Sequence, residues 1–176
     1  MNFKTLVLSS LLLVSTISAN SLDITSLETD FTQTIVNDQN AKITYTGKMY
    51  ATSAKNQALW EYNSPIVKKI YYKGGKELVI IEPELEQVIY AKLNKVPNIL
   101  KLLQSAKKIS ANKLQTRFNG LTYNIETNGN KIEKISYTDE MQNSVVISFA
   151  NEKVNGVIRG SRFAYTIPAD YDILEQ

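Results

Sequence analysis

The chain has 176 residues, of which 43% are hydrophobic, and it carries 20 basic against 17 acidic side chains with no histidine and no cysteine. These absences exclude the usual Ser-His and Cys-His nucleophile pairs, ordinary zinc sites and any disulfide. Basic side chains are scattered among acidic ones, which argues against a dedicated nucleic-acid surface. Carboxylate groups such as Glu82, Glu84 and Glu86 occupy turn-like positions, so we expect no enzyme, no metal site and no cofactor.

The first 19 residues are typical of a secretory signal peptide. Lys4 provides a basic start, Leu6–Ile17 is apolar apart from Ser and Thr, and Ala19 is a small residue at a suitable cleavage position. The apolar run is too short to span a bilayer comfortably. We therefore expect cleavage near Ala19, and an exported protein whose single domain is residues 20–176, long enough for a sizeable core.

The N-terminal part of this domain is expected to contain one short helix and two strands. Ser21–Thr29 is compatible with a helix, and Phe31–Val36 and Ile43–Ala51 alternate in the manner of strands. Gly47, inside the second strand, predicts a bulge or a sharp bend of the kind that a curved sheet requires.

The segment Gln57–Leu93 organises the rest of the chain. It reads as four short strands rich in Trp, Tyr, Ile and Val, separated by Pro- and Gly-containing turns. Glu77–Glu82 is apolar on both faces, so we expect this strand to be covered on both sides. The basic doublets Lys68-Lys69 and Lys107-Lys108 are expected on solvated faces.

An amphipathic helix of about 13 residues is expected after these strands, within residues 94–110, with Asn94 as a candidate cap. One stripe of the helix is apolar, and it consists of Val96, Ile99, Leu100, Leu103 and Ala106. The opposite side is polar and consists of Asn98, Lys101, Ser105 and Lys108. Two interpretations stay open, a fixed plug in the open end of a sheet and a movable lid.

The C-terminal half reads as strands and tight turns, with Asn-Gly pairs at two of the turns. The expected strands are Leu114–Phe118, Leu121–Thr127, Lys131–Asp139, Asn143–Ala150, Val154–Ile158 and Phe163–Ile167. About eleven strands joined by short turns predict an antiparallel meander that curls into a barrel or a half-barrel. Its concave surface, covered by one apolar helix, is expected to bind an apolar ligand.

Five segments resemble a known family in order and spacing. They are Asp-Phe-Thr-Gln-Thr-Ile at Asp30–Ile35, Thr46-Gly47, Trp-Glu-Tyr-x-x-Pro at Trp60–Pro65, the segment Tyr72–Val88 with a Gly-Gly turn and a Glu-Pro turn, and Phe-Ala-Tyr-Thr-Ile-Pro at Phe163–Pro168. Together they resemble the periplasmic outer-membrane lipoprotein carriers, the LolA family, from Leu22 to Ile173. The resemblance implies a mainly β (α+β) fold, an incomplete antiparallel β-barrel of about eleven strands with an α-helical lid over an apolar cavity.

The resemblance also implies a function and partners. Such a protein binds the acyl chains of lipoproteins released by an inner-membrane ABC transporter, crosses the periplasm and delivers its cargo to an outer-membrane acceptor. We expect a monomer. The nearest competing function is a carrier of the same build for glycolipid or phospholipid. A lipid-sensing regulatory domain, an outer-membrane β-barrel and an enzyme fit the sequence less well.

Candidate cavity residues, each of which could equally be ordinary core, are Tyr45, Met49, Trp60, Tyr62, Ile70, Tyr72, Ile80 and Tyr90. The candidate lid consists of the five apolar stripe residues of the helix. Family members often carry an Arg-Pro pair whose arginine helps to latch the lid, and Ala54 and Lys55 stand at these positions here. Lys55 is the candidate latch, and it lacks the guanidinium fork of arginine. Family members also commonly carry a tryptophan just after the turn that precedes Glu77. This chain has Glu77-Leu78-Val79 there and no tryptophan.

Overall fold

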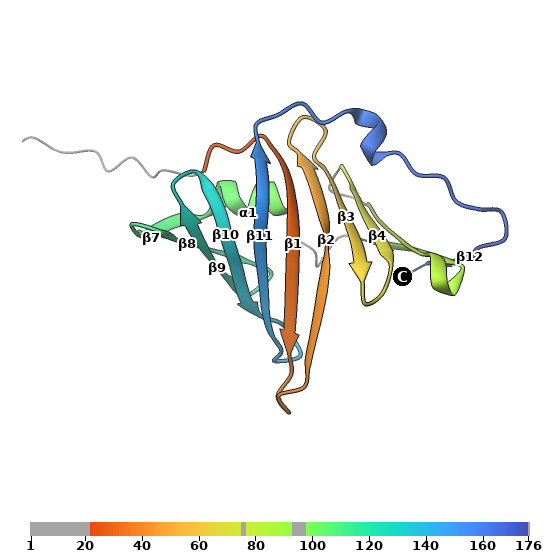
Figure 1. Ribbon diagram of the computed structural model, residues 1–176, viewed down its shortest axis with the longest axis horizontal. Helices are drawn as coiled ribbons and strands as arrows, with labels where there is room; N and C mark the ends of the chain where they lie inside the picture. The colour runs from red at the N-terminus through yellow and green to blue at the C-terminus, as the bar shows by residue number, and fades with distance from the viewer. Residues whose placement is uncertain (1–21, 75–76, 93–97, 176) are drawn as a thin grey trace, which may run out of the picture.

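The computed structural model describes residues 22–74, 77–92 and 98–175 (Figure 1). The expected signal peptide with its cleavage position at Ala19, the candidate cap Asn94 and the candidate lid residue Val96 all lie outside these described residues. Among the residues that are described, no helix has the length and apolar character needed to cross a bilayer.

One antiparallel sheet dominates the described part of the chain. Its strands are β1 (Ser26–Val36), β2 (Lys42–Thr52), β3 (Gln57–Ser64), β4 (Lys68–Lys73), β5 (Glu77–Glu82), β6 (Gln87–Lys92), β7 (Lys107–Ser110), β8 (Lys113–Phe118), β9 (Leu121–Asn128), β10 (Lys131–Thr138), β11 (Ser144–Val154) and β12 (Asp172–Glu175). The order across the sheet is β12-β6-β5-β4-β3-β2-β1-β11-β10-β9-β8-β7. Among these described strands, only β12 is parallel to its neighbour, β6. The described helices are α1 (Ile99–Ser105) and the 3-10 turns η1 (Pro83–Leu85) and η2 (Gly160–Phe163).

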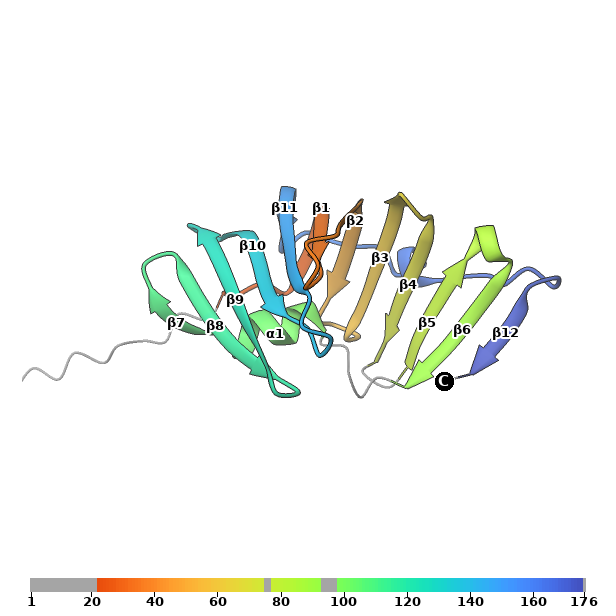
Figure 2. The ribbon, with the colours of Figure 1, turned by 90° about the horizontal axis from the view of Figure 1, so that it is seen from below.

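The sheet curls around α1 and remains open, with β7 and β12 as its two edges (Figure 2). The prediction of a mainly β fold with one open antiparallel sheet is therefore confirmed, and the described residues form 12 strands where about eleven were expected. The predicted irregularity at Gly47 is also confirmed, because the pairing of β2 with β3 shifts register between Thr46 and Gly47. Such a shift bends a strand and increases the local twist of the sheet.

Two apolar cores lie on opposite faces of the sheet. The larger core fills the concave face and includes Leu27, Met49 and Ile125 together with the buried side of α1. The smaller core lies on the convex face and includes Leu59, Val79, Val88 and Phe163.

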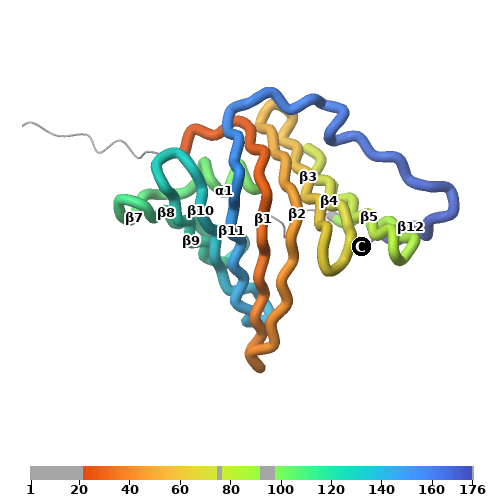
Figure 3. The backbone as a smooth tube through the Cα atoms, in the orientation of Figure 1, coloured from red at the N-terminus to blue at the C-terminus, as the bar shows by residue number. Residues whose placement is uncertain are grey.

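The convex core is covered by residues 155–171, which run along the outside of the sheet from β11 to β12 (Figure 3). Tyr165 of this segment packs on Tyr71, with ring centres 5.0 Å apart. The prediction that β5 is covered on both faces is therefore confirmed, since Leu78 belongs to the concave core and Val79 to the convex one.

Several predicted elements were wrong. The described residues of the predicted helix Ser21–Thr29 do not form one, because β1 already begins at Ser26 and residues 22–25 are irregular, with a bend at Thr25. Val154–Ile158 is not a strand, since β11 ends at Val154 and Asn155 adopts a φ of 58°. Phe163–Ile167 also lies outside the sheet, where its apolar side chains pack on the convex face. Strands β7 and β12 were not predicted.

Candidate functional site

The hollow of the sheet is occupied by α1, which contacts β8 and β2 (Figure 2). The helix has only 7 residues, about half the predicted length, and the chain continues into β7 two residues later. Ile99, Leu100 and Leu103 are buried, as is Ala106 directly after the helix. These are the predicted lid residues that the structure describes, and all of them pack in the concave core. Leu102 joins them.

An apolar cavity of about 150 Å³ lies between α1 and the sheet. It is lined by Gln33, Trp60, Tyr62, Ile70, Ile99, Leu102, Tyr123, Ile135, Tyr137 and Ile147. Three of the predicted cavity residues and one predicted lid residue therefore meet at one cavity. Gln33 is the one amide side chain in this lining, and the other lining residues are aromatic or aliphatic. A ligand here therefore meets an almost wholly apolar wall.

Aromatic side chains give this wall its shape. The ring of Phe31 lies 5.0 Å from the rings of both Trp60 and Tyr62 in edge-to-face geometry, and the rings of Tyr123 and Tyr137 are 4.7 Å apart. Such contacts add to the stability that burial alone gives. Burial raises the pKa of Tyr62, and it raises the pKa of Tyr137 to about 12, so both hydroxyls stay neutral at physiological pH.

The other predicted cavity residues lie elsewhere. Tyr45, Met49, Tyr72 and Ile80 belong to the concave core but do not line this cavity, and Met49 is completely buried. Tyr90 was assigned to the wrong face, because it packs with Val79 and Val88 in the convex core.

The helix is tied to the turn between β2 and β3 through a pair of asparagines. The side-chain oxygen of Asn98 accepts hydrogen bonds from the backbone N–H groups of Leu100 (2.9 Å) and Lys101 (3.4 Å), which makes Asn98 the N-cap. Its amide nitrogen donates to the side-chain oxygen of Asn56 at 3.0 Å. Asn98 is 3% exposed, so its predicted place on the polar side of the helix was wrong.

The candidate latch Lys55 stands beside this contact but does not take part in it. Its side chain is exposed in the turn, and none of the hydrogen bonds or ion pairs of the described residues involves it. The neighbouring Asn56 makes the contact with the helix instead.

Replacing this cap is expected to loosen α1. Asn98→Ala removes the cap and the bond to Asn56, so we expect a loss of about 1–2 kcal/mol in the free energy of unfolding. Amide hydrogen exchange at Leu100 and Lys101 is expected to accelerate more than exchange in the sheet. Urea unfolding and exchange measured by mass spectrometry check this. Asn63→Ala, at an exposed position in β3, is the matched control, and equal effects of the two substitutions would contradict the capping role.

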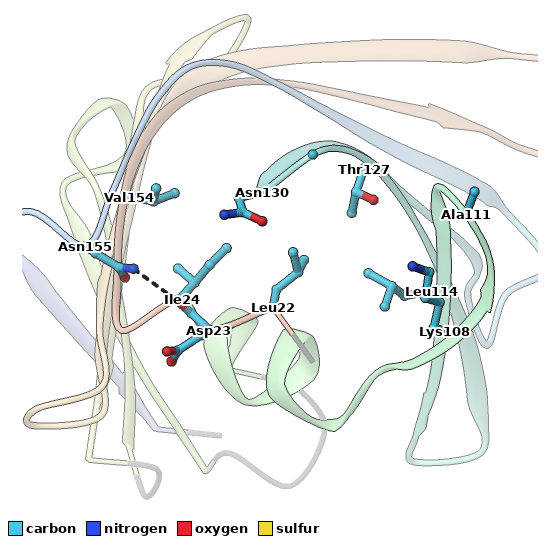
Figure 4. Close-up of a pocket in the computed structure, with 11 residues that line it drawn as sticks. Leu22, Asp23, Ile24, Lys108, Ala111, Leu114, Thr127, Asn130, Val154 and Asn155 are labelled. Atoms are coloured by element: carbon cyan, nitrogen blue, oxygen red, sulfur yellow. Dashed lines mark hydrogen bonds between the residues drawn. The ribbon is translucent and has the colours of Figure 1, made fainter. Parts of the chain in front are cut away.

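A second pocket, of about 320 Å³, opens at the end of the hollow where β11 leaves the sheet (Figure 4). Leu22, Ile24 and Leu114 project into it above α1. The side chain of Asn155 holds the first described residues in place, since it donates to the backbone carbonyl of Asp23 at 2.9 Å and accepts from the N–H of Thr25 at 2.8 Å. The N-terminal segment thus forms one wall of this pocket.

The sequence analysis missed the half of the cavity that the C-terminal strands supply. Tyr123, Ile135, Tyr137 and Ile147 were placed on strands, but no inward face was assigned to those strands. Period-two alternation could have found them, because Tyr123 and Ile125 share a face, as do Ile135 and Tyr137.

The chain is similar to known proteins in sequence and in fold. No family model matches the chain. The chain is 35% identical over 156 residues to the outer-membrane lipoprotein carrier protein of Campylobacter jejuni, with 89% of this chain and 90% of that protein covered. It is 30% identical over 164 residues to the protein of the same name in Helicobacter hepaticus, with 93% and 90% covered. Among solved structures, a LolA superfamily protein of Nitrosomonas europaea is similar in fold, with a TM-score of 0.51 at 11% identity over 81% of this chain and 91% of that one.

Proposed function

Because the chain belongs to the family of outer-membrane lipoprotein carrier proteins, we propose that it binds the acyl chains of lipoproteins and carries them through the periplasm. The observation that carries this proposal is the apolar cavity between α1 and the concave face, which has the chemistry of an acyl-chain site. The chain acts as a binder and not as an enzyme. Its partners are an inner-membrane transporter that releases lipoproteins and an outer-membrane acceptor that receives them.

The size of the cavity supports a lid role for α1 in this proposal. A methylene fills about the same volume as a water molecule in the liquid, roughly 30 Å³, so a cavity of about 150 Å³ holds about five methylenes. A membrane acyl chain is several times longer, and the remaining room is occupied by Leu100 and Leu103 of the helix. Cargo therefore enters by displacing α1 from the concave core and not by filling an existing void.

The energetics suit a reversible carrier. Burial of each methylene stabilises the complex by about 0.8 kcal/mol, so a whole chain offers some 10 kcal/mol or more. Displacing α1 costs part of this energy, because the buried leucines of the helix lose the same kind of contact. An isolated helix of 7 residues is not stable in water, so α1 depends on its packing and has no strong internal structure to break. The hydrogen bond from Asn98 to Asn56 would be the latch of the empty state.

Binding of acylated and unacylated peptides tests the proposal. The chain contains one tryptophan, Trp60, and it lines the cavity, so its fluorescence should report the arrival of an acyl chain. We expect a triacylated lipopeptide to bind and the same peptide without acyl chains not to bind. Equal binding of both peptides, or preferential binding of phospholipid offered in competition, would contradict a lipoprotein carrier.

A charge in the cavity is expected to abolish most of this binding. Ile70→Glu places a carboxylate in the apolar wall at a half-buried position, where the variant can still fold. We expect the affinity for the lipopeptide to fall at least tenfold, which corresponds to about 1.4 kcal/mol. Leu85→Glu, in the exposed 3-10 turn η1, is the matched control and should bind as the parent does. Unchanged affinity of the first variant, with its fold verified by circular dichroism, would show that acyl chains bind elsewhere.

A further inference from the structure

A cation, Lys68, contacts Tyr62, one of the residues that line the apolar cavity. Lys68 lies on β4 two residues before the cavity residue Ile70, and it faces Tyr62 across the β3–β4 pair. Side chains two positions apart share one face of a strand, so Lys68 projects from the concave face. Both lysines of the Lys68-Lys69 doublet were expected on a solvated face, and this expectation holds for Lys69 alone.

The ammonium of Lys68 is surrounded by aromatic rings. It lies 4.9 Å from the centre of the Tyr62 ring and 5.4 Å from the centre of the Tyr45 ring, and the side chain is half-buried. None of the ion pairs formed by the described residues includes Lys68, whereas Lys69 pairs with Glu61 at 3.3 Å on the other face. Cation–π contacts hold the ammonium over the rings without neutralising its charge.

A second donor group contacts the same tyrosine. The hydroxyl of Tyr62 donates to the side-chain oxygen of Gln33 at 2.8 Å, which fixes the orientation of that amide. Gln33 lines the cavity, and none of the hydrogen bonds of the described residues uses its amide N–H₂ as a donor. Tyr62, in the cavity wall, is thus flanked by an ammonium and an amide N–H₂, and no carboxylate lines the cavity or pairs with Lys68 among the described residues.

We propose that Lys68 and Gln33 form a head-group site that binds the carbonyl oxygens at the head of an acyl chain while the methylenes lie in the cavity beyond. This inference rests on the proposed function and deepens it, because it fixes which end of the chain lies at the margin. The shared chemistry is an acyl carbonyl, which an ester or amide of a lipoprotein and the carboxylate of a free fatty acid both present. Donors placed at one end of an apolar cavity orient a ligand that would otherwise bind in either direction.

Three ligands of equal chain length test this site. Dodecanoate, methyl dodecanoate and dodecanol share the alkyl chain, and only the first two carry a carbonyl. We expect Trp60 fluorescence titrations to give at least tenfold tighter binding of dodecanoate than of dodecanol, with methyl dodecanoate in between. Lys68→Met should reduce the affinity for dodecanoate about tenfold and leave that for dodecanol unchanged. Lys69→Met, whose ion pair lies on the opposite face, should change neither affinity.

Each result separates the head-group site from the proposed function. If all three ligands bind the parent equally, or if Lys68→Met weakens dodecanol as much as dodecanoate, the head-group site is wrong and the acyl cavity stands. If Lys68→Met affects only dodecanoate and Gln33→Leu affects both carbonyl ligands, the head-group site is supported, and the amide binds the carbonyl of either head while the ammonium adds affinity for an anionic one. If none of the ligands binds the parent, the proposed acyl cavity is wrong and the head-group site falls with it.

Discussion

The oxidised double variant Ser105→Cys/Thr116→Cys is expected to lose its affinity for long acyl chains, at least hundredfold, and to regain it on reduction. The hydroxyl oxygens of Ser105, in the last turn of α1, and Thr116, on β8, lie 2.9 Å apart. A disulfide needs sulfur atoms about 2 Å apart, so a small adjustment at these positions brings two thiols into bonding distance. The natural chain has no cysteine, so the new pair has no competing partner.

The expected loss follows from the need to displace the helix. A cross-link holds Leu100 and Leu103 in the concave core, and only the existing cavity of about 150 Å³ remains for a ligand. A hundredfold loss corresponds to about 2.8 kcal/mol. A chain of about five methylenes fits the existing cavity and should bind the oxidised and reduced forms alike.

The matched controls are the two single variants, which cannot form the intramolecular bond and should bind long chains in both redox conditions. Titration of the Trp60 fluorescence with palmitoylated peptide, with and without reductant, measures the effect. Full binding by the oxidised double variant, with the disulfide verified by mass spectrometry, would mean that α1 is a fixed plug and that cargo enters by another route.

Side-chain alternation predicted most of the sheet because it reports a physical requirement. An extended chain with one buried face places apolar residues at every second position, and β8, β9 and the first half of β11 follow this rule closely. The same rule explains the error at Phe163–Ile167. Phe163, Tyr165 and Ile167 alternate because all three pack on the convex face. Alternation shows that a face is buried, but it does not show whether the backbone pairs with a neighbouring strand.

The remaining errors come from interactions between distant parts of the chain. The N-terminal segment does not form the predicted helix because Asn155, 130 residues away from Thr25, hydrogen-bonds to its backbone, and the local sequence carries no sign of this partner. Tyr90 was placed on the wrong face because β5 is apolar on both sides and therefore could not indicate which face of β6 turns inward. The asparagine at position 98 is a standard N-cap, and it was missed because the helix was expected to begin at about residue 94.

The core and the margin of the cavity differed in how well they could be predicted. Trp60, Tyr62 and Ile70 could be assigned from their strands, because burial of large apolar side chains follows from the pattern alone. The role of Lys68 could not, because a lysine in an alternating strand is compatible with solvent on either face. Its place over two tyrosine rings depends on the curvature that brings β2, β3 and β4 around the hollow.

That curvature depends on Gly47, and Gly47→Ala is expected to destabilise the fold by about 3 kcal/mol. A β-carbon at this position would collide with the backbone carbonyl oxygen of Glu61 on β3 and would lie 2.8 Å from the ring of Phe31. The carbonyl belongs to the paired strand and cannot move without opening the β2–β3 ladder at its register shift. The ring also has little freedom, because its edge-to-face contacts with Trp60 and Tyr62 hold it.

The substitution therefore links the fold to the site. Urea unfolding should give the stability loss, and the Trp60 emission should shift even in the folded variant, because a displaced Phe31 changes its surroundings. Gly156→Ala is the matched control, since a β-carbon there meets nothing within 4 Å, and it should alter stability by less than about 0.5 kcal/mol. Equal stability of the two variants would mean that the strands relax around the added methyl group. The bend at Gly47 would then be a consequence of the curved sheet and not one of its causes.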